Sequence, residues 1–140
     1  YFAMYPGVQA YMDATIEEAH DRGYVETLFN RRRYLPELKS RAFNERAAAE
    51  RMAINMPIQG TTADIMKMAM VRVDQAITAE NLSGRMILQV HDDLLFEVPS
   101  SQLNQFSRVA CDRMTSAVDL RIPLAVDAKA GPNWRDMTQL

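Results

Sequence analysis

Residues 85–98, RMILQVHDDLLFEV, hold the most informative pattern in the chain. Two apolar runs, Arg85–Val90 and Leu94–Val98, flank the polar residues His91-Asp92-Asp93. Short apolar runs bounded by turn-forming residues are typical of β-strands that are covered on at least one face. The stretch therefore predicts a β-hairpin whose turn carries an imidazole and two carboxylates.

The predicted turn is unusual in its chemistry. Hairpin turns that contain Asp commonly place Gly or Asn beside it, whereas here two negative charges are adjacent. Carboxylate oxygens are ligands that suit Mg²⁺ or Mn²⁺. Because successive side chains on a strand point to opposite faces, we expect one of Asp92 and Asp93 to bind a metal closely and the other to help through water. A two-metal site would need a further carboxylate from elsewhere, and a solvated turn without metal is the alternative.

The segments after the hairpin predict one helix and one more strand. Ser100 or Ser101 can cap a helix, and apolar residues then recur at helical spacing. A last strand is expected near Leu124–Ala128, before the loop Gly131–Trp134. The apolar stripe of the helix consists of Leu103, Phe106, Ala110, Met114 and Ala117.

The segments before the hairpin are mostly helical in pattern. A helix is expected to begin near Pro6 and to stop at Gly23, and residues 24–35 form a short β-like stretch. Residues 40–55 and 58–80 predict two helices that are broken or kinked at Pro57. The fold class is therefore α+β, with long helices packed on a small antiparallel sheet that contains the hairpin. Residues 1–140 show no linker and are expected to form a single fragment.

Three hydrogen-bond donors recur every four residues on the central helical stretch, at Arg51, Asn55 and Gln59. On an ideal helix they fan over about 80° of one face and span about 12 Å. Every base pair offers acceptors in the minor groove, so such a row could follow correctly shaped pairs without reading their sequence. The alternative is a plain polar stripe on a half-exposed helix.

A basic segment surrounds this row. Residues 22–51 carry eight Arg or Lys against four Glu, although the net charge of the whole chain is −2. Arg31, Arg32 and Arg33 follow the turn-forming Asn30, and three successive guanidinium groups could clamp a phosphate backbone. A solvated basic loop is the alternative.

The composition excludes several other classes of protein. The chain has 48% hydrophobic residues, which argues against disorder, but no apolar run long enough for a transmembrane helix. Cys111 is the single cysteine, which excludes a disulfide framework and a cysteine zinc site and is compatible with a reducing, intracellular compartment. The chain starts at Tyr1 without an initiator Met or a signal sequence, so we expect a fragment of a longer protein.

Four segments, taken in order, resemble the C-terminal part of the family A DNA polymerases, the group of bacterial DNA polymerase I. The match covers essentially the whole chain, and its specificity lies in the order and spacing of the segments. The segments are Gly23–Thr27 with Arg31–Arg33 and Pro36, Glu50–Asp64, Gln89–Asp92, and Gly131 with Asn133 and Trp134.

The resemblance implies a portion of the polymerase palm and a template-dependent transfer of nucleotides from dNTP to a primer 3′-hydroxyl, with two Mg²⁺ ions. Asp92 matches the aspartate of the family's motif C that binds the catalytic Mg²⁺, and His91 matches a histidine that approaches the primer terminus. Arg51, Asn55 and Gln59 match residues that contact primer–template DNA near the terminal pair.

Three positions depart from the family's usual residues. Asp93 stands in place of Glu; it keeps the charge but is one methylene shorter, and we expect it to assist catalysis and metal binding through water. Asn30 replaces Gly in the basic hairpin, and Thr62 replaces Ala. The family's motif A and its nucleotide-gripping fingers helix lie upstream of the matching region. The fragment is therefore expected to need the rest of the polymerase chain and to be inactive alone.

Two other classes of function stay open on the residues alone. One is a metal-dependent nuclease that uses Asp92 and Asp93 on phosphodiesters, and the other is a non-catalytic nucleic-acid-binding module whose acidic turn is structural. The resemblance favours a polymerase in the cytoplasm of a bacterium or a phage-infected cell, associated with the nucleoid and without membrane contact.

Overall fold

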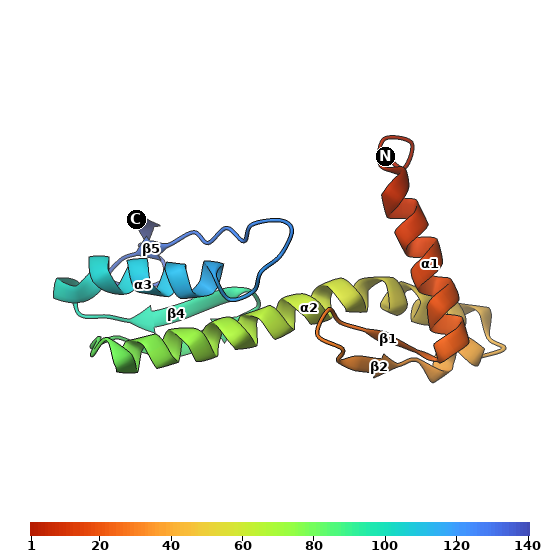
Figure 1. Cartoon of the computed structure of the whole chain (residues 1–140), viewed down its shortest axis with the longest axis horizontal. Coiled ribbons are helices and arrows are strands. Elements are labelled where there is room, and N and C mark those ends of the chain that lie inside the picture. Colours follow the sequence, from red (N-terminus) through yellow and green to blue (C-terminus); the bar gives the residue numbers. More distant parts are fainter. The chain divides into compact units, whose positions relative to one another are not determined.

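The computed structural model describes residues 1–140 (Figure 1). Its helices and two-stranded antiparallel sheets confirm the α+β class. Contacts divide the chain into two compact units, residues 1–64 and 65–140, and each is described by itself. The elements are α1 (Pro6–Arg22), β1 (Tyr24–Glu26), β2 (Arg32–Tyr34), η1 (Pro36–Lys39), α2 (Phe43–Ala79), β3 (Arg85–Val90), β4 (Asp93–Glu97), η2 (Ser100–Gln102), α3 (Leu103–Thr115), β5 (Lys129–Ala130) and β6 (Thr138–Gln139).

The first helix has the limits that the sequence predicts. Pro6 occupies the first turn of α1, where a missing N–H costs nothing. Gly23 ends the helix in the left-handed region, with φ of 75°, and its N–H donates to the carbonyl of Ala19. Glycine adopts this conformation without the steric cost that a Cβ brings.

The β-like stretch is a hairpin of two short strands. β1 pairs with β2 in antiparallel register, with Tyr24 opposite Tyr34 and Glu26 opposite Arg32. Asn30 takes a φ of 62° in the connecting loop, which agrees with the tolerance of Asn for this region. The hydroxyl of Thr27 closes the loop by accepting from the N–H groups of Phe29 and Arg31.

The core of the first unit forms on one face of α2. Ala49 and Ala53 are completely buried there, and such small side chains allow other segments to approach the helix closely. Burial at this face explains why the hairpin and η1 fold back onto α2. The core residues are Ala19, Val25, Leu35, Leu38, Ala49, Ala53 and Met56.

The expectation of two separate helices is wrong, because α2 is one continuous helix from Phe43 to Ala79 with Pro57 inside it; the alternative, a kink at Pro57, stays a prediction. Proline removes one backbone hydrogen bond and disfavours the helix. Together with Gly60, Thr61 and Thr62, its helix propensity is about 5 kcal/mol less favourable than that of four alanines. Local preference therefore predicts an interruption here, and tertiary contacts of this segment, described below, must override it.

The second unit contains the hairpin that the apolar runs predict. β3 and β4 pair antiparallel, with Arg85 opposite Glu97 and Val90 opposite Asp93. The register shifts between Met86 and Leu88, which marks a β-bulge; bulges increase the local twist of a strand. The second strand begins at Asp93, one residue earlier than expected, so the turn has only two residues.

The end of α2 is fixed by a Schellman motif. Asn81 adopts a φ of 50°, its N–H donates to Thr78, and the N–H of Leu82 donates to Ile77. This 6→1 and 5→2 pair of hydrogen bonds satisfies carbonyls at the helix end. Leu82 thereby enters the core of the second unit. That core contains Val73, Leu82, Phe106 and Ala110, with Ile77, Met86, Phe96, Val98, Val109 and Met114 packed around it.

We predict that Gly84→Ala destabilises the second unit. A Cβ at Gly84 would lie 2.2 Å from Cε2 of Phe106, whose side chain is buried and packs edge-on against Phe96. Overpacking of this kind costs about 1–3 kcal/mol, so thermal unfolding of the chain, followed by circular dichroism, should start several degrees lower. Gly7→Ala is the matched control, because a Cβ at Gly7 meets nothing within 4 Å. Equal melting of the two variants would contradict the close packing at Gly84.

Two expectations in the C-terminal segment need correction. Neither Ser100 nor Ser101 caps α3; they lie in η2, and the helix begins after Gln102 without a side-chain cap. The strand expected at 124–128 is absent, because those residues find no ladder partner, and the pairing is instead Lys129–Ala130 with Thr138–Gln139. The strands form three separate two-stranded sheets, where one small sheet was expected. No helix of the chain has the combination of length and apolar character needed to cross a lipid bilayer.

Candidate functional site

The acidic turn at the tip of β3–β4 has a strained backbone. His91 and Asp92 are the two residues between the paired positions Val90 and Asp93. His91 takes a φ of 54°, a region that costs a non-glycine residue about 1–2 kcal/mol. The side-chain amide of Gln89 donates to the carbonyl of His91 over 3.1 Å. Strain at a turn of this kind points to a functional constraint on the residue that bears it.

The carboxylates of this turn are accessible and unpaired. His91, Asp92 and Asp93 are exposed, and no ion pair of the chain includes either aspartate. Asp92 belongs to the turn and Asp93 to the first position of β4. The two carboxylates thus come from backbone in different conformations, and the division of their roles stays a prediction.

The donor set of the turn suits part of a metal site. Two exposed carboxylates provide the hard oxygen ligands that Mg²⁺ prefers. No group of three or more His, Cys, Asp or Glu side chains in the chain could hold a metal. The chemistry of the two aspartates suits a divalent cation, for which they supply two oxygen-bearing side chains.

The three predicted donors are free on the first unit. Arg51, Asn55 and Gln59 are all exposed on α2. On an ideal helix their row is centred about 140° from the buried face of Ala49 and Ala53. No hydrogen bond within the chain uses their side chains. The structure divides the predicted site residues between the units, with the donor row in the first and the acidic turn in the second.

The three consecutive arginines do not form one free basic patch. Arg31 donates from Nε to Asp64 and from Nη2 to the carbonyl of Gly60, both over 2.9 Å. Arg32 is 2.7 Å from Glu26 and lies over the ring of Tyr24.

The remaining contacts of this cluster support the same picture. The hydrogen bond with Glu26 raises the pKa of Arg32 above its ordinary value. Arg33 approaches the sulfur of Met52 over 3.3 Å. Arg31 is therefore bonded to α2. Of the three arginines predicted to clamp a phosphate backbone, Arg33 has the weakest contact within the chain, a single approach to a sulfur atom.

Sequence reasoning did not identify the residues of α2 that contact the β1–β2 hairpin. Asp64 pairs with Arg31 although its side chain is only 13% exposed, and the hydroxyl of Thr61 accepts from the N–H of Leu28 over 2.9 Å. A Cβ at Gly60 would lie 2.7 Å from Cγ2 of Thr27. A glycine inside a long helical pattern was the available signal, because it often marks a close approach of another segment.

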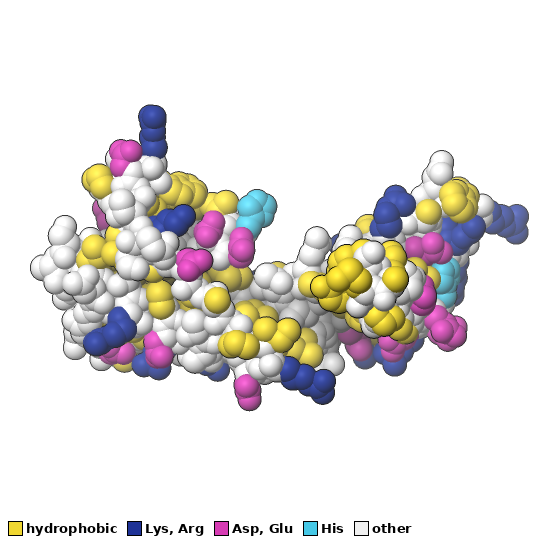
Figure 2. All heavy atoms as spheres, turned by 90° about the horizontal axis from the view of Figure 1, so that it is seen from above, with side chains coloured by type: hydrophobic (Ala, Val, Ile, Leu, Met, Phe, Trp, Pro, Cys, Tyr) yellow, Lys and Arg dark blue, Asp and Glu magenta, His cyan; other side chains and the backbone are white.

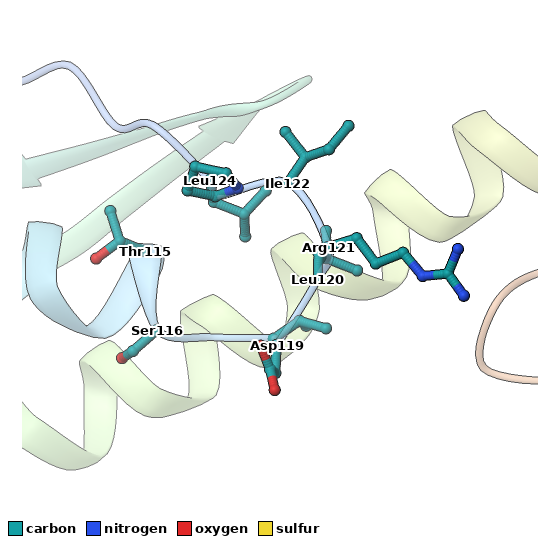
Figure 3. Close-up of a pocket in the computed structure, with 9 residues that line it drawn as sticks. Thr115, Ser116, Asp119, Leu120, Arg121, Ile122 and Leu124 are labelled. Atoms are coloured by element: carbon teal, nitrogen blue, oxygen red, sulfur yellow. The ribbon is translucent and has the colours of Figure 1, made fainter.

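A surface pocket in the second unit contributes nothing to the predicted site. The loop after α3 encloses about 500 Å³, and Figure 3 shows the side chain of Arg121 directed away from the other labelled residues. None of the predicted site residues lines this pocket, which is bounded by Thr115, Ser116 and Val118 to Leu124.

Comparison with known proteins decides the family. The family model described as DNA polymerase family A matches residues 1–136. The chain belongs to this family. DNA polymerase I of Geobacillus stearothermophilus is 49% identical over 136 residues, which are 97% of this chain and 16% of that protein. DNA polymerase I of Deinococcus radiodurans is 50% identical over 136 residues, 97% of this chain and 14% of that protein.

A solved structure supports the same relationship. The polymerase domain of Pol1 from M. smegmatis, in complex with a DNA primer-template and dNTP, aligns with a TM-score of 0.86 and 46% identity. The alignment covers 89% of this chain and 22% of that domain. The chain spans only about a sixth of the length of the curated relatives it matches. The resemblance inferred from the four sequence segments is confirmed at the level of family and fold.

Proposed function

We propose that the protein containing this chain is a DNA-directed DNA polymerase, and that residues 1–140 form the C-terminal part of its polymerase domain, within the palm. The reaction would be attack of a primer 3′-hydroxyl on the α-phosphate of a dNTP, with release of pyrophosphate. The observation that carries this proposal is the unpaired, exposed acidic turn at the tip of β3–β4, in a chain that belongs to family A.

In this proposal Asp92 is the principal metal ligand of the chain. Its place in a tight turn leaves the carboxylate exposed for direct coordination, while Asp93 assists through water from the start of β4. Mg²⁺ held there would supply Lewis-acid activation of the hydroxyl and charge stabilisation at the phosphates. His91, in its strained turn position, would lie against the primer terminus.

The donor row is proposed to hold the primer–template duplex. Arg51, Asn55 and Gln59 all project from the exposed face of α2, where their N–H groups would donate to minor-groove acceptors that every base pair presents. Arg32 and Arg33 would add attraction to the phosphate backbone. A role in copying DNA would place the protein in the cytoplasm with the nucleoid, as the sequence predicts.

The function is tested with the full-length protein that contains this chain. Primer extension is measured with Mg²⁺, all four dNTPs and a primer–template, beside a nuclease assay on the same duplex. Template-dependent extension that requires a divalent cation supports the proposal. Strand cleavage without extension would favour a nuclease, and binding without either reaction would favour a non-catalytic module.

We predict that Gln59→Ala lowers kcat/KM for primer extension by about 10-fold, because it removes a charge-neutral hydrogen bond near the primer terminus. The loss should be similar for all four terminal base pairs, since the minor-groove acceptors are shared. Gln75→Ala, at another exposed glutamine of α2, is the control and should extend normally. A loss confined to one kind of terminal pair would contradict a role in reading shape alone.

A further inference from the structure

The helical turn that carries Gln59 is the weakest part of α2 by composition. It contains Pro57, Gly60, Thr61 and Thr62, all of which favour the helix less than alanine does. Nevertheless α2 passes through this segment without interruption. Because these residues favour a helix only weakly, contacts with other segments are needed to stabilise this part of α2.

The tip of the β1–β2 hairpin makes its contacts at this same turn. Arg31 bridges the helix by donating to the carbonyl of Gly60 and to Oδ1 of Asp64, both over 2.9 Å. The hydroxyl of Thr61 accepts from the N–H of Leu28 over 2.9 Å and itself donates to the carbonyl of Pro57. The hairpin thus contacts Gly60, Thr61 and Asp64, which follow the proline, and Thr61 in turn donates to the carbonyl of Pro57.

The hairpin also packs closely against α2, at Gly60. The absence of a Cβ at Gly60 leaves room for the methyl group of Thr27, and Thr27 is itself buried at 4% exposure. The second oxygen of Asp64 is buried and has no hydrogen-bond partner, so Arg31 is the main compensation for this carboxylate. A mostly buried carboxylate that loses its partner is destabilising.

The hairpin reaches the helix from the side away from the DNA-facing row. On an ideal helix Gly60 and Asp64 lie within about 60° of the buried Ala49, whereas Gln59 lies about 80° from that residue on its other side. The contacts therefore leave the amide of Gln59 exposed. They act on Gln59 through the helix backbone.

We propose that Arg31, with Asp64 and Thr61, positions Gln59 by clamping the weak turn of α2 in helical form, and that Arg31 does not bind the phosphate backbone. This assignment rests on the proposed function, because it concerns the DNA contact of Gln59. It replaces the sequence-based prediction of Arg31 as part of a phosphate clamp. Arg31 is a positioning residue, since its guanidinium is directed to α2.

Three measurements on the full-length protein test the assignment. Arg31→Ala should lower kcat/KM for primer extension about 10-fold in the unaltered background but less than about 2-fold in the Gln59→Ala background, as expected for residues that act through one another. The slope of log Kd against log salt for primer–template binding should stay unchanged. Loss of a phosphate contact would instead reduce that slope by about 1. Hydrogen exchange at the amides of residues 58–64 should accelerate at least about 10-fold.

Matched variants separate the clamp from loss of charge or of folding. Thr61→Val is nearly isosteric, leaves the charge unchanged and should reproduce the pattern of Arg31→Ala. Arg22→Ala removes one arginine that pairs with Glu18 and Glu26 and should leave exchange at residues 58–64 unaltered.

The outcomes distinguish this assignment from the proposed function. Equal losses in both backgrounds, a smaller salt slope for Arg31→Ala, or unchanged exchange at residues 58–64 would each overturn the positioning role. Extension by the unaltered protein would still uphold the function. Failure of the unaltered protein to extend any primer would overturn the function and, with it, the role assigned to Gln59.

Discussion

Asp92→Ala in the full-length protein is expected to reduce primer extension by about 1,000-fold or more, while the affinity for primer–template DNA changes less than about 3-fold. The reason is that a metal ligand contributes several kcal/mol to stabilisation of the transition state but little to contacts with the duplex. Single-turnover extension at saturating Mg²⁺ measures the first quantity, and equilibrium binding of a labelled duplex measures the second.

Two further variants are compared with Asp92→Ala in the same extension assay. Asp93→Ala should be milder, with a loss of about 10-fold, because a ligand that acts through water is partly replaced by water itself. Asp74→Ala removes an exposed carboxylate of α2 that makes no ion pair and should extend normally. Near-normal extension by Asp92→Ala would exclude its role as metal ligand, and equal losses for Asp92 and Asp93 would overturn the division between them.

Elements with strong local signals could be predicted from the sequence. Pro6 and Gly23 mark the two ends of α1 by their backbone preferences alone. The apolar runs of β3 and β4, with two-strand pairing across a short turn, identify the hairpin. These features depend on residues close together in the chain, so one sequence is enough to recognise them.

Elements that depend on distant partners could not be predicted in the same way. Pro57 signals a break or a kink, whereas α2 continues through it, and the contacts of Arg31 with Gly60 and Asp64 come from a distant part of the chain. Residues 124–128 have strand-like composition but form no strand ladder, whereas Lys129–Ala130 pairs with Thr138–Gln139. A strand requires a neighbour, and composition does not reveal which segment provides it.

The same reasoning applies to the candidate site. The residue types and spacings single out Asp92 and the row of Arg51, Asn55 and Gln59, because chemistry at a turn or on a helix face is visible in the sequence. The contacts of Arg31 with Gly60 and Asp64 could not be predicted, since three consecutive arginines look alike until their partners are known. Asp64 was not singled out, because a lone acidic residue on a helix carries no signal of a partner 33 residues away.

The isolated 140-residue chain is expected to fold but to show no template-dependent primer extension. Each unit has its own apolar core, so the helices and hairpins can bury one another. Catalysis by two metal ions needs carboxylates from separate segments, and the chain contains no group of three or more metal-ligating side chains. The acidic turn alone is therefore an incomplete site.

The surface of the isolated chain adds a second expectation, that of self-association. Figure 2 shows apolar side chains at the surface of both units. The large apolar side chains exposed in the chain include Phe43 at 71% and Ile122 at 76% exposure. Large exposed apolar patches favour association with other protein surfaces, so sizing by light scattering should detect dimers or larger species whose population rises with concentration. Primer extension by the purified chain, with Asp92→Ala as its inactive control, is the decisive assay. Extension that the unaltered chain catalyses and the variant does not would show that residues 1–140 contain the complete catalytic machinery, and would contradict the partial metal site proposed for the turn at His91–Asp93.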